Sequence, residues 1–561
     1  MEIKKIKQKI ISRLDIKSQV YKDNYSEMMK KLSEIEDLLD LAEMGGGPNH
    51  HARLAKRGKM SIRDRIFNVL DPDSPFLEIS SLAAYESQYT IGGGAVAGIG
   101  VISGVECVIF GNDPTVLGGA LTSYAAKKWG RCIEIARDNG IPYISFVESA
   151  GADLRIDPKS KQKMSNIGSG HFAESGRWFY EMTELSKMRI PTIAVVFGSS
   201  TAGGAYQPGM SDYNIFIRNQ SKVFLAGPPL VQMATGEVSD DETLGGAQMH
   251  SEVSGLSDYL AEDEMDALRL CREVVSHLNW KKPEKNIKEQ PEEPIYDSEE
   301  LLGLVSSDLK TPFDIKEAIA RFSDGSRFEE FKPMFGPTIV CGWTHVHGYP
   351  VAVIGNNGAI YPDSSQKAAH FIQLCNKINT PIIFLQNVTG FLVGKEFERD
   401  GSIKKGSQLI NAVSNSTVPH ITIILGASYG AGTYAMSGRA FNNRFTFIWP
   451  SAKIAVMGGK QIAGVMSLVR RARAMRKGEK FDEEEDKKIV AAVEKLQEDG
   501  SRALEASGLV SDDGIIDPRD TRTVIGMCLS IVGNKKIEGT MHNVIVTMTV
   551  KFLFLIRLFT K

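Results

Sequence analysis

The sequence predicts an α/β protein made of two tandem domains, each holding a largely parallel sheet. Three observations lead to this fold class. The chain has 561 residues, more than one hydrophobic core usually supports. Apolar runs typical of buried strands alternate with helical segments, which is the pattern of parallel sheets. Three segments of the first half recur in the same order in the second half, so we infer a duplication.

The first 45 residues predict a helical arm. Apolar residues at helical spacing, from Ile3 to Leu14, lie in a basic N-terminus, and residues 20–45 are rich in Glu, Lys and Leu. We expect a surface helix over the first 22 residues. A mitochondrial presequence is the alternative, which the scarcity of arginine and the acidic Glu2 and Asp15 disfavour.

Strands and helices alternate through the first domain, residues 46–285. Apolar strands joined by helices favour a parallel arrangement. In order, the sequence predicts a strand at 105–113, a helix at 123–140, a strand at 141–151, a helix at 175–188 and a strand at 190–200.

A linker is predicted at residues 279–297, because this stretch is charged, contains prolines and has few apolar residues. It precedes a second domain, residues 286–540, in which the repeat is visible. The matched segments are 104–113 with 348–357, 141–151 with 380–390, and 190–206 with 418–434. The last match is gapless, since its prolines and its tyrosines are both 228 residues apart.

Composition excludes several classes of function. A net charge of −2 does not suggest nucleic-acid binding. The six cysteines are scattered without a CxxC pair, which indicates a reducing compartment, and the histidines lack ligand spacing, so we expect no metal site. The atypical apolar tail at 541–561 is interrupted by Lys551 and Arg557, so we expect no membrane span. We expect a packed final segment there; a membrane contact or an incorrectly predicted gene end is the alternative.

The last repeated segment carries a motif made mostly of small residues, without a His, Cys, Lys or carboxylate side chain. In both copies, SSTAGGAY and ASYGAGTY, a strand ends and small residues open a predicted helix. Helix N-termini leave N–H groups unpaired, and glycine lets a ligand approach them. Two converging N–H groups form an oxyanion hole, which suits enolate chemistry on a thioester. The alternatives are a tight turn or a phosphate loop, although no GxxxxGK[ST] occurs.

Several long motifs closely resemble the carboxyltransferase (β) subunit of biotin-dependent acyl-CoA carboxylases. The resemblance runs from about residue 45 to about 538 and is closest to methylcrotonyl-CoA carboxylase β and related acyl-CoA carboxylase β subunits. The motifs are GGGAVAGIGVISGVECVIFGND, GSSTAGGAYQPGMSD, FLAGPPLVQMATGE, LGGAQMHSEVSGLSDY, QNVTGFLVG, SYGAGTYAMSGRAF and DDGIIDPRDTR.

The resemblance implies two crotonase-like (ClpP/crotonase) domains, each a spiral of ββα units. It also implies a homo-oligomer of β subunits, usually a hexamer, with the active site between the first domain of one copy and the second domain of another. CoA would bind the first domain and biotin the second.

Site residues follow from the same resemblance. The first hole would consist of the N–H groups of Gly203 and Gly204, beside Ala202, and would hold the acyl-CoA thioester oxygen. The second hole would consist of the N–H groups of Ala431 and Gly432, beside Gly430, and would hold the ureido oxygen of biotin. The two holes are 228 residues apart, as the repeat requires. The remaining substrate-binding residues implied are Ala226, Gly227 and Pro228 beside the acyl-CoA, and Gly390 and Phe391 at the biotin entrance.

The implied function is transfer of a carboxyl group from carboxybiotin to an acyl-CoA enolate, a ligase reaction that needs no general base from this chain. No ATP-using carboxylase or biotinyl domain is visible, so we expect an α subunit that carries biotin. We expect 3-methylcrotonyl-CoA (leucine degradation) as substrate; propionyl-, acetyl- and longer acyl-CoA remain open. The expected compartment is the mitochondrial matrix for a eukaryotic host and the cytoplasm for a bacterial one.

Three other functions stay open at this point. The α subunit of a biotin-dependent decarboxylase, such as glutaconyl-CoA decarboxylase, would share the motifs. A crotonase-type hydratase or isomerase is disfavoured by the duplication and by the lack of a matched carboxylate pair. A non-catalytic subunit is disfavoured because the glycines of both motifs are intact.

Charged residues near the motifs have two interpretations each. Glu148 and Asp153 stand where crotonase relatives place acid–base carboxylates, but the repeat puts Asn387 at the position of Glu148, so we expect a structural role. The basic residues of the 123–140 helix could meet CoA phosphates or form a solvated face; they are Lys127, Lys128 and Arg131.

Overall fold

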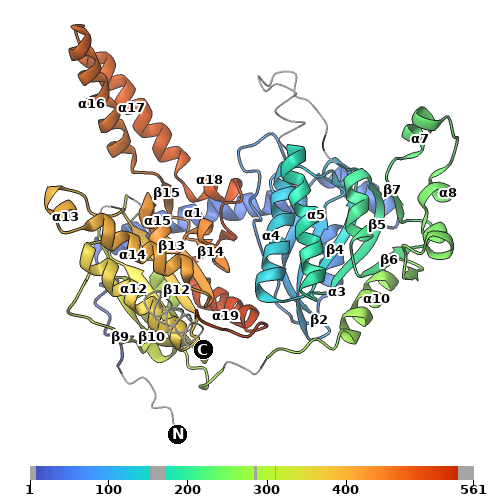
Figure 1. The fold of residues 1–561 in the computed structure, drawn as a ribbon, viewed down its shortest axis with the longest axis horizontal. Helices are drawn as coiled ribbons and strands as arrows, with labels where there is room; N and C mark the ends of the chain where they lie inside the picture. Colours follow the sequence, from blue (N-terminus) through green and yellow to red (C-terminus); the bar gives the residue numbers. More distant parts are fainter. Residues whose placement is uncertain are drawn as a thin grey trace, which may run out of the picture.

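The computed structural model describes residues 8–151, 153, 171–283, 287–306, 308–309 and 311–540. Two eight-stranded sheets lie side by side, one in each half of the chain (Figure 1). The predicted α/β class is therefore confirmed.

The first sheet has the order β1-β2-β3-β4-β5-β6-β8, with β7 paired to β5. Its first three strands are antiparallel, and every pairing from β3 to β8 is parallel. The strands are β1 (Leu77–Glu78), β2 (Ala95–Ile102), β3 (Val105–Asn112), β4 (Tyr143–Ser149), β5 (Thr192–Thr201), β6 (Tyr213–Ile217), β7 (Lys222–Phe224) and β8 (Tyr259–Ala261).

The second sheet repeats this order strand for strand. It runs β16-β14-β13-β12-β11-β10-β9, with β15 paired to β13 as β7 is to β5. Its strands are β9 (Glu329–Glu330), β10 (Ile339–Val346), β11 (Tyr349–Asn356), β12 (Ile382–Val388), β13 (His420–Tyr429), β14 (Phe445–Ile448), β15 (Lys453–Ala455) and β16 (Gly514–Ile515). The three matched sequence segments thus become β3 with β11, β4 with β12 and β5 with β13, which confirms the predicted repeat.

Helices follow the same duplication. The first half has α3 (Ile62–Val69), α4 (Ser123–Asn139), α5 (His171–Lys187), α6 (Tyr206–Gly209), α7 (Pro228–Thr235), α8 (Asp241–Gly245), α9 (Ala247–Met249) and α10 (Glu264–His277). The second half has α11 (Ile315–Phe322), α12 (Pro362–Lys377), α13 (Lys395–Arg399), α14 (Ser402–Asn415), α15 (Ala431–Ala435), α16 (Gly459–Lys477), α17 (Glu483–Gly500), α18 (Ala503–Gly508) and α19 (Thr521–Val532).

Local sequence signals set the helix ends. The side chain of Thr122 caps α4 by accepting a hydrogen bond from Ala125 N, and Gly140 ends this helix in the left-handed conformation. A capping box between Ser61 and Asp64 begins α3.

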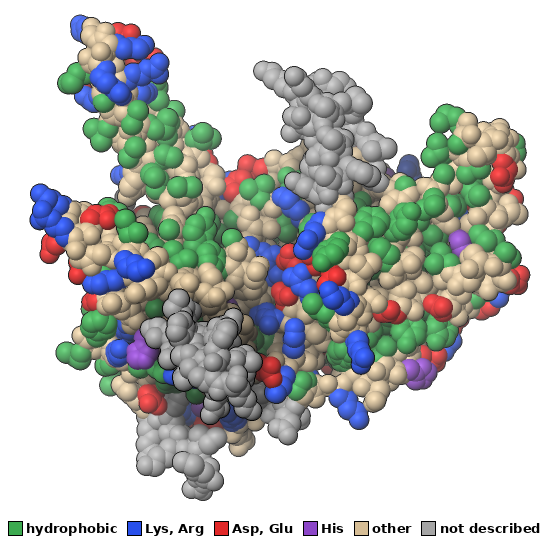
Figure 2. Space-filling view, in the orientation of Figure 1, with side chains coloured by type: hydrophobic (Ala, Val, Ile, Leu, Met, Phe, Trp, Pro, Cys, Tyr) green, Lys and Arg blue, Asp and Glu red, His purple; other side chains and the backbone are tan. Residues whose placement is uncertain are grey.

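The largest departure from the duplicated plan is the α16–α17 hairpin, which projects from the body (Figure 1). Hydrophobic side chains gather along its stem, while Lys and Arg gather at its tip (Figure 2). Val465, Leu468 and Val469 on α16 are exposed by 51%, 68% and 58%. The helix that occupies the same place in the first half, α7, buries none of its residues, and α16 buries only Gly459 and Ala463.

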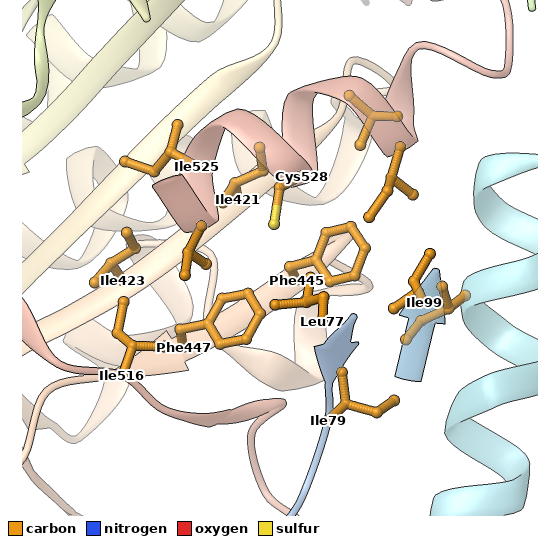
Figure 3. Packing of buried hydrophobic residues seen from close by; sticks show 14 of the residues in the cluster. Leu77, Ile79, Ile99, Ile421, Ile423, Phe445, Phe447, Ile516, Ile525 and Cys528 are labelled. Atoms are coloured by element: carbon orange, nitrogen blue, oxygen red, sulfur yellow. The ribbon is translucent and has the colours of Figure 1, made fainter. Parts of the chain in front are cut away.

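The two halves share one hydrophobic core. Leu77, Ile79 and Ile99 of the first half belong to the same buried cluster as Phe447 and Cys528 of the second (Figure 3). Because this core is continuous, neither sheet could separate without exposing apolar surface.

A buried ion pair crosses the same contact. Arg131 on α4 donates from Nε to Asp513 Oδ1 at 2.6 Å and from Nη2 to Asp513 Oδ2 at 2.9 Å. Both side chains are buried, so each charge depends on the other.

The N-terminal segment differs from the prediction. Residues 8–18 are not helical, so the predicted surface helix is wrong for them; the arm's helix, α1 (Gln19–Met44), starts later and is followed by α2 (Pro48–Lys56). Phe328 N donates to Gln8 O at 2.9 Å, and Ile10 N donates to Ser326 O at 2.9 Å. Backbone pairing with the second half therefore replaces the helical hydrogen bonds.

The predicted linker is held against the second half along its described residues. Ile295 N donates to Ser326 Oγ at 2.9 Å, and Arg327 pairs with Glu292 at 2.6 Å. The apolar tail at 541–561 lies outside the described residues. Among the described helices, none is both long and apolar enough to cross a bilayer.

Candidate active site

The first predicted hole lies where β5 ends. A short 3-10 helix, η3 (Ala202–Ala205), follows Thr201 directly and leads into α6. Among the described residues, no acceptor is assigned to the N–H groups of Gly203 and Gly204. Gly203 is exposed and Gly204 is half-buried, so both N–H groups belong to residues at the surface.

Packing explains only one of these two glycines. A Cβ on Gly204 would lie 3.0 Å from Ser200 Oγ and 3.3 Å from Ser149 Cβ, closer than most real contacts. A Cβ on Gly203 would meet nothing nearer than Phe179 at 3.9 Å. Gly203 is therefore not required by packing within the chain.

The second predicted hole lies where β13 ends. Gly430 has φ 59° and ψ −147°, a conformation that side chains disfavour, and α15 begins at the next residue. Ala431 is exposed, Gly432 is buried, and among the described residues neither N–H has an assigned acceptor. A Cβ on Gly432 would lie 2.6 Å from Val388 Cγ2 and 3.2 Å from Gly390 Cα.

The two holes differ in the hydroxyl behind them. In the second half, Ser428 Oγ donates to Gln386 Oε1 at 2.6 Å and lies 2.8 Å from Thr433 Oγ1. The matching Ser200 hydroxyl is buried and has no hydrogen-bond partner in the described part of the chain. The first hole is therefore backed by an unpaired polar group, and the second by a closed network.

The other predicted site residues lie close to these strand ends. Thr201 pairs with Phe224 of β7, and Ala226, Gly227 and Pro228 follow that strand, with Gly227 as the N-cap of α7. Gly390 adjoins Gly432, and the half-buried Phe391 bridges to Ile360. Each set thus gathers at one strand end, but the two sets lie on different sheets (Figure 1).

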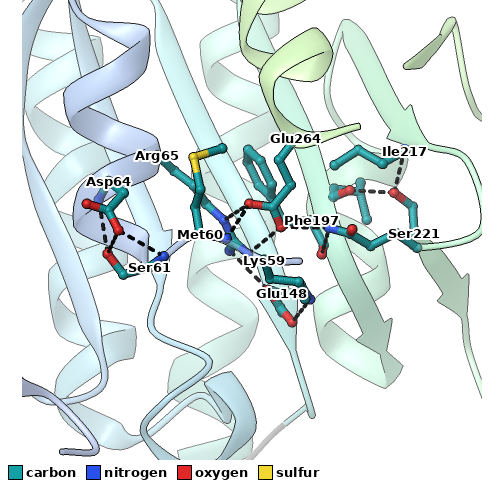
Figure 4. Close-up of polar contacts among 12 residues, drawn as sticks. Lys59, Met60, Ser61, Asp64, Arg65, Glu148, Phe197, Ile217, Ser221 and Glu264 are labelled. Carbon is teal, nitrogen blue, oxygen red and sulfur yellow. Dashed lines mark hydrogen bonds and ion pairs between the residues drawn. The ribbon is translucent and has the colours of Figure 1, made fainter. Parts of the chain in front are cut away.

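Glu148 lies in a network of charges beneath β5 (Figure 4). Its carboxylate accepts from Lys59 and, at 3.0 Å, from Arg65 Nη1, and Arg65 also binds Glu264 with two hydrogen bonds. A Cβ on Gly198 would lie 2.6 Å from Glu148 Oε1, so the carboxylate packs against the strand. Burial lowers the pKa of Lys59. Glu148 is paired twice, which favours the structural interpretation.

The repeat places Asn387 in the same relation to β13. Its Oδ1 accepts from Ala427 N at 3.3 Å and would lie 2.7 Å from a Cβ on Gly426. An amide thus replaces the carboxylate without loss of the strand contact. Asp153 is described, but residues 154–170 lie outside the described residues.

The basic residues of α4 do not form one open face. Lys128 is buried and donates to Gly92 O at 3.2 Å and to Ala95 O at 2.6 Å, and burial lowers its pKa to about 8. Arg131 binds Asp513, whereas Lys127 is exposed and donates to Leu509 O at 3.2 Å. A CoA phosphate contact is therefore wrong for Lys128 and Arg131, whose partners lie too far along the sequence to be seen in a helical pattern.

In the described part of the chain, no group of three or more His, Cys, Asp or Glu is arranged to hold a metal ion. His250 illustrates a structural role. Its Nε2 bonds Val223 O and its Nδ1 bonds Ser254 Oγ, both at 2.7 Å.

Comparison with known proteins places the chain among carboxylase subunits. The model of the carboxyl transferase domain family matches residues 53–545. A probable biotin-dependent acyl-coenzyme A carboxylase beta2 subunit of Mycobacterium tuberculosis is 52% identical over 535 residues, covering 94% of this chain and 98% of the relative. The mitochondrial methylcrotonoyl-CoA carboxylase beta chain of Dictyostelium discoideum is 43% identical over 529 residues, covering 94% and 88%.

A solved structure agrees with these relatives. The beta subunit of geranyl-CoA carboxylase from P. aeruginosa has a TM-score of 0.85 and 40% identity, covering 95% of this chain and 98% of that one. The similarity thus extends over both sheets.

Proposed function

Because this chain belongs to the carboxyl transferase domain family, as the carboxyltransferase β subunit of a biotin-dependent acyl-CoA carboxylase, we propose that it carboxylates 3-methylcrotonyl-CoA. Two relatives carry names that support this substrate: the Dictyostelium methylcrotonoyl-CoA carboxylase and the P. aeruginosa geranyl-CoA carboxylase. Both acyl groups are 3-methyl-2-enoyl thioesters. A proton on the γ carbon, which is attached to C3, becomes acidic when negative charge can move through the double bond to the thioester oxygen.

The observation that carries the mechanism is the pair of matched strand ends with open N–H groups. Gly203 and Gly204 donate to the thioester oxygen of the acyl-CoA, and this stabilises the enolate as charge develops. No carboxylate or histidine of this chain is needed, which fits the paired state of Glu148.

The second hole fits the partner's biotin, since two N–H donors match one ureido oxygen. Ala431 and Gly432 would hold that oxygen, with Gly390 and Phe391 at the approach. Carboxybiotin supplies the carboxyl group to be transferred. The role of this chain is to hold the two oxygens so that donor and acceptor carbon meet.

We also propose that a second copy completes each site, within a homo-oligomer, usually a hexamer, that binds a biotin-carrying α subunit. The two holes of one chain lie on separate sheets, and in this proposal a first hole meets the second hole of another chain. Exposed apolar side chains follow both holes: Leu230 and Met233 on α7 are 50% and 80% exposed, and α16 is similarly uncovered. Such faces are typical of interfaces.

The proposed divisions of the chain are an arm at 1–45, an acyl-CoA domain at 46–285, a biotin domain at 286–540 and a tail at 541–561. The proposed compartment is the mitochondrial matrix in a eukaryotic host and the cytoplasm in a bacterial host; the name of the Dictyostelium relative, a mitochondrial beta chain, supports the first.

The test is recovery of the tagged chain from its host, probed with streptavidin and assayed for ATP-dependent fixation of labelled bicarbonate into a panel of acyl-CoAs. A biotinylated partner and label in 3-methylcrotonyl-CoA are expected. Label confined to propionyl- or acetyl-CoA would overturn the substrate. An intact complex with no ATP-dependent fixation would favour a decarboxylase.

A further inference from the structure

The α16–α17 hairpin has an open face whose character changes along its length. Val465, Val469, Arg473 and Arg476 on α16 follow one another at spacings of four, four and three residues, so they lie on one face of the helix. Val465 and Val469 are 51% and 58% exposed, and both arginines are exposed. This open face is therefore apolar along the stem of the hairpin and basic at its tip (Figure 2).

The arginines of α16 divide into two sets. Arg470 and Arg471 each pair with a carboxylate of α17. In the described part of the chain, neither Arg473 nor Arg476 has a carboxylate partner, and Arg476 donates only to a main-chain oxygen one turn before it. Because a guanidinium group binds phosphate with paired hydrogen bonds, these two arginines are suited to an anion from outside the chain.

The stem of the open face starts beside the second hole. Gly430 N donates to Ala455 O at 2.9 Å, and the next residue, Val456, is 75% exposed and leads to α16. At about 1.5 Å a residue, Val465 and Arg476 are about 17 Å apart along the helix axis. The open face thus extends from the proposed biotin site out to two arginines on the projecting hairpin (Figure 1).

Three cations of the first half are already engaged by groups of the chain. Lys128 and Arg131 are buried, and they bind main-chain oxygens and a carboxylate. Lys222 on β7, next to Ser199 at the end of β5, pairs with two carboxylates at 3.2 and 3.4 Å. CoA carries several phosphate charges, whose binding depends on Lys and Arg contacts. Since these three cations are not free for phosphate, another chain can supply the contacts.

Building on the proposed function, we propose that the open face of α16 binds the phosphate end of the acyl-CoA that a second copy of this chain holds. In that function the first hole of one chain meets the second hole of another, and the pantetheine arm of the substrate leaves the shared site beside the stem. The apolar stem contacts this arm, and Arg473 and Arg476 bind the phosphates beyond it. One chain thus supplies the hole for the thioester, and the other supplies phosphate recognition.

The test is the double variant Arg473→Gln/Arg476→Gln in the complex with its biotin-carrying partner. It is assayed with two thioesters of the 3-methylcrotonyl group: the CoA thioester and the pantetheine thioester, which has no phosphate. With the CoA thioester we expect KM to rise by about tenfold and kcat to stay within about twofold, because contacts remote from the reacting atoms bind ground state and transition state equally. With the pantetheine thioester we expect KM to equal that of the parent.

Lys487→Gln/Lys488→Gln is the matched control. It removes the same charge from exposed positions on α17, the other helix of the hairpin. We expect this control to keep the parent's KM for both thioesters. Added salt should raise KM for the CoA thioester more steeply in the parent than in the arginine variant, since salt weakens contacts between cations and phosphates.

An equal rise in KM for both thioesters would overturn the proposal, because the arginines would then act on assembly or on the partner protein. Unchanged KM for the CoA thioester would also overturn it, and a lower melting temperature would then assign Arg473 and Arg476 to stabilising the C-terminal end of α16. Failure of the proposed substrate is distinguished by calorimetry with free CoA. CoA should bind the parent complex more tightly than the arginine variant, whichever acyl-CoA the complex carboxylates.

Discussion

Replacement of Gly432 by alanine tests the second hole most directly. The new Cβ would lie 2.6 Å from Val388 Cγ2 and 3.2 Å from Gly390 Cα. Ordinary contacts begin at 3.4 Å, so Val388 Cγ2 and the start of α15 must move apart by close to 1 Å. Val388 is fully buried and its β-branched side chain has little rotational freedom, so part of the shift falls on α15 and its N–H groups.

The size of the effect follows from that shift. Misplacement of a catalytic group by about 1 Å costs on the order of 100-fold in rate. Removal of one oxyanion donor lowers the rate by about 10²–10³-fold, or about 3–4 kcal/mol. A donor that is displaced but still present should lower the rate by an amount near the lower end of this range. Overpacking adds about 1–3 kcal/mol of destabilisation. We therefore expect kcat to fall about 100-fold, while KM for the acyl-CoA, held on the other sheet, changes little.

The assay is ATP-dependent fixation of labelled bicarbonate by the complex, together with thermal unfolding to show that the variant is folded. Gly176→Ala on α5 is the matched control, because a Cβ there meets nothing within 4 Å. It should keep full activity. A folded Gly432→Ala enzyme with kcat within about threefold of the parent would refute the donor role, since such a change is far below the loss of a donor.

Three further predictions concern charged groups. Burial raises the pKa of Asp512 from 3.8 to about 7, so between these pH values the folded protein holds a proton there that the unfolded chain has lost. Stability should therefore fall as pH rises from about 4 to about 7. Asp512→Asn should flatten this dependence in melting curves taken at several pH values. Arg131→Ala should lower the free energy of unfolding, measured in denaturant, by about 3–5 kcal/mol, because Asp513 is left buried and unpaired. A decrease as small as that of a surface ion pair would contradict the stabilising role of Arg131 at the contact between the two halves. Glu148→Ala should lower the melting temperature but reduce kcat of the folded enzyme by less than about tenfold, because the carboxylate pairs with Lys59 rather than with substrate; a fall of 10²-fold or more would instead indicate acid–base catalysis.

The sequence predicted the duplicated architecture well because the repeat is local and gapless around the site. The 228-residue offset between Gly204 and Gly432 survives as two strand ends with the same pairing. The helix predicted at 123–140 also begins where α4 does, at Ser123. Where structure depends on neighbouring residues, sequence reasoning was sufficient.

Contacts between residues far apart in the chain could not be predicted from the sequence. In the sequence, Lys128 and Arg131 cannot be told apart from the exposed Lys127. In the structure, Lys128 donates to main-chain carbonyls, and Arg131 binds an aspartate 382 residues away. Residues 8–18 have helical spacing but pair with the second half, because backbone partners at Ser326 and Phe328 are available only after folding. The left-handed φ of Ala202 is likewise invisible in a run of small residues.

The core shared by Leu77, Phe447 and their neighbours has a consequence for motion and for dissection of the chain. In a duplicated protein with a charged connector, the two domains are usually expected to move as separate rigid bodies about that connector. Here the connector cannot act as a hinge, because the surfaces on either side of it are fused. Cleavage within it should leave two fragments that stay together and unfold in a single transition, whereas either fragment made alone should be insoluble.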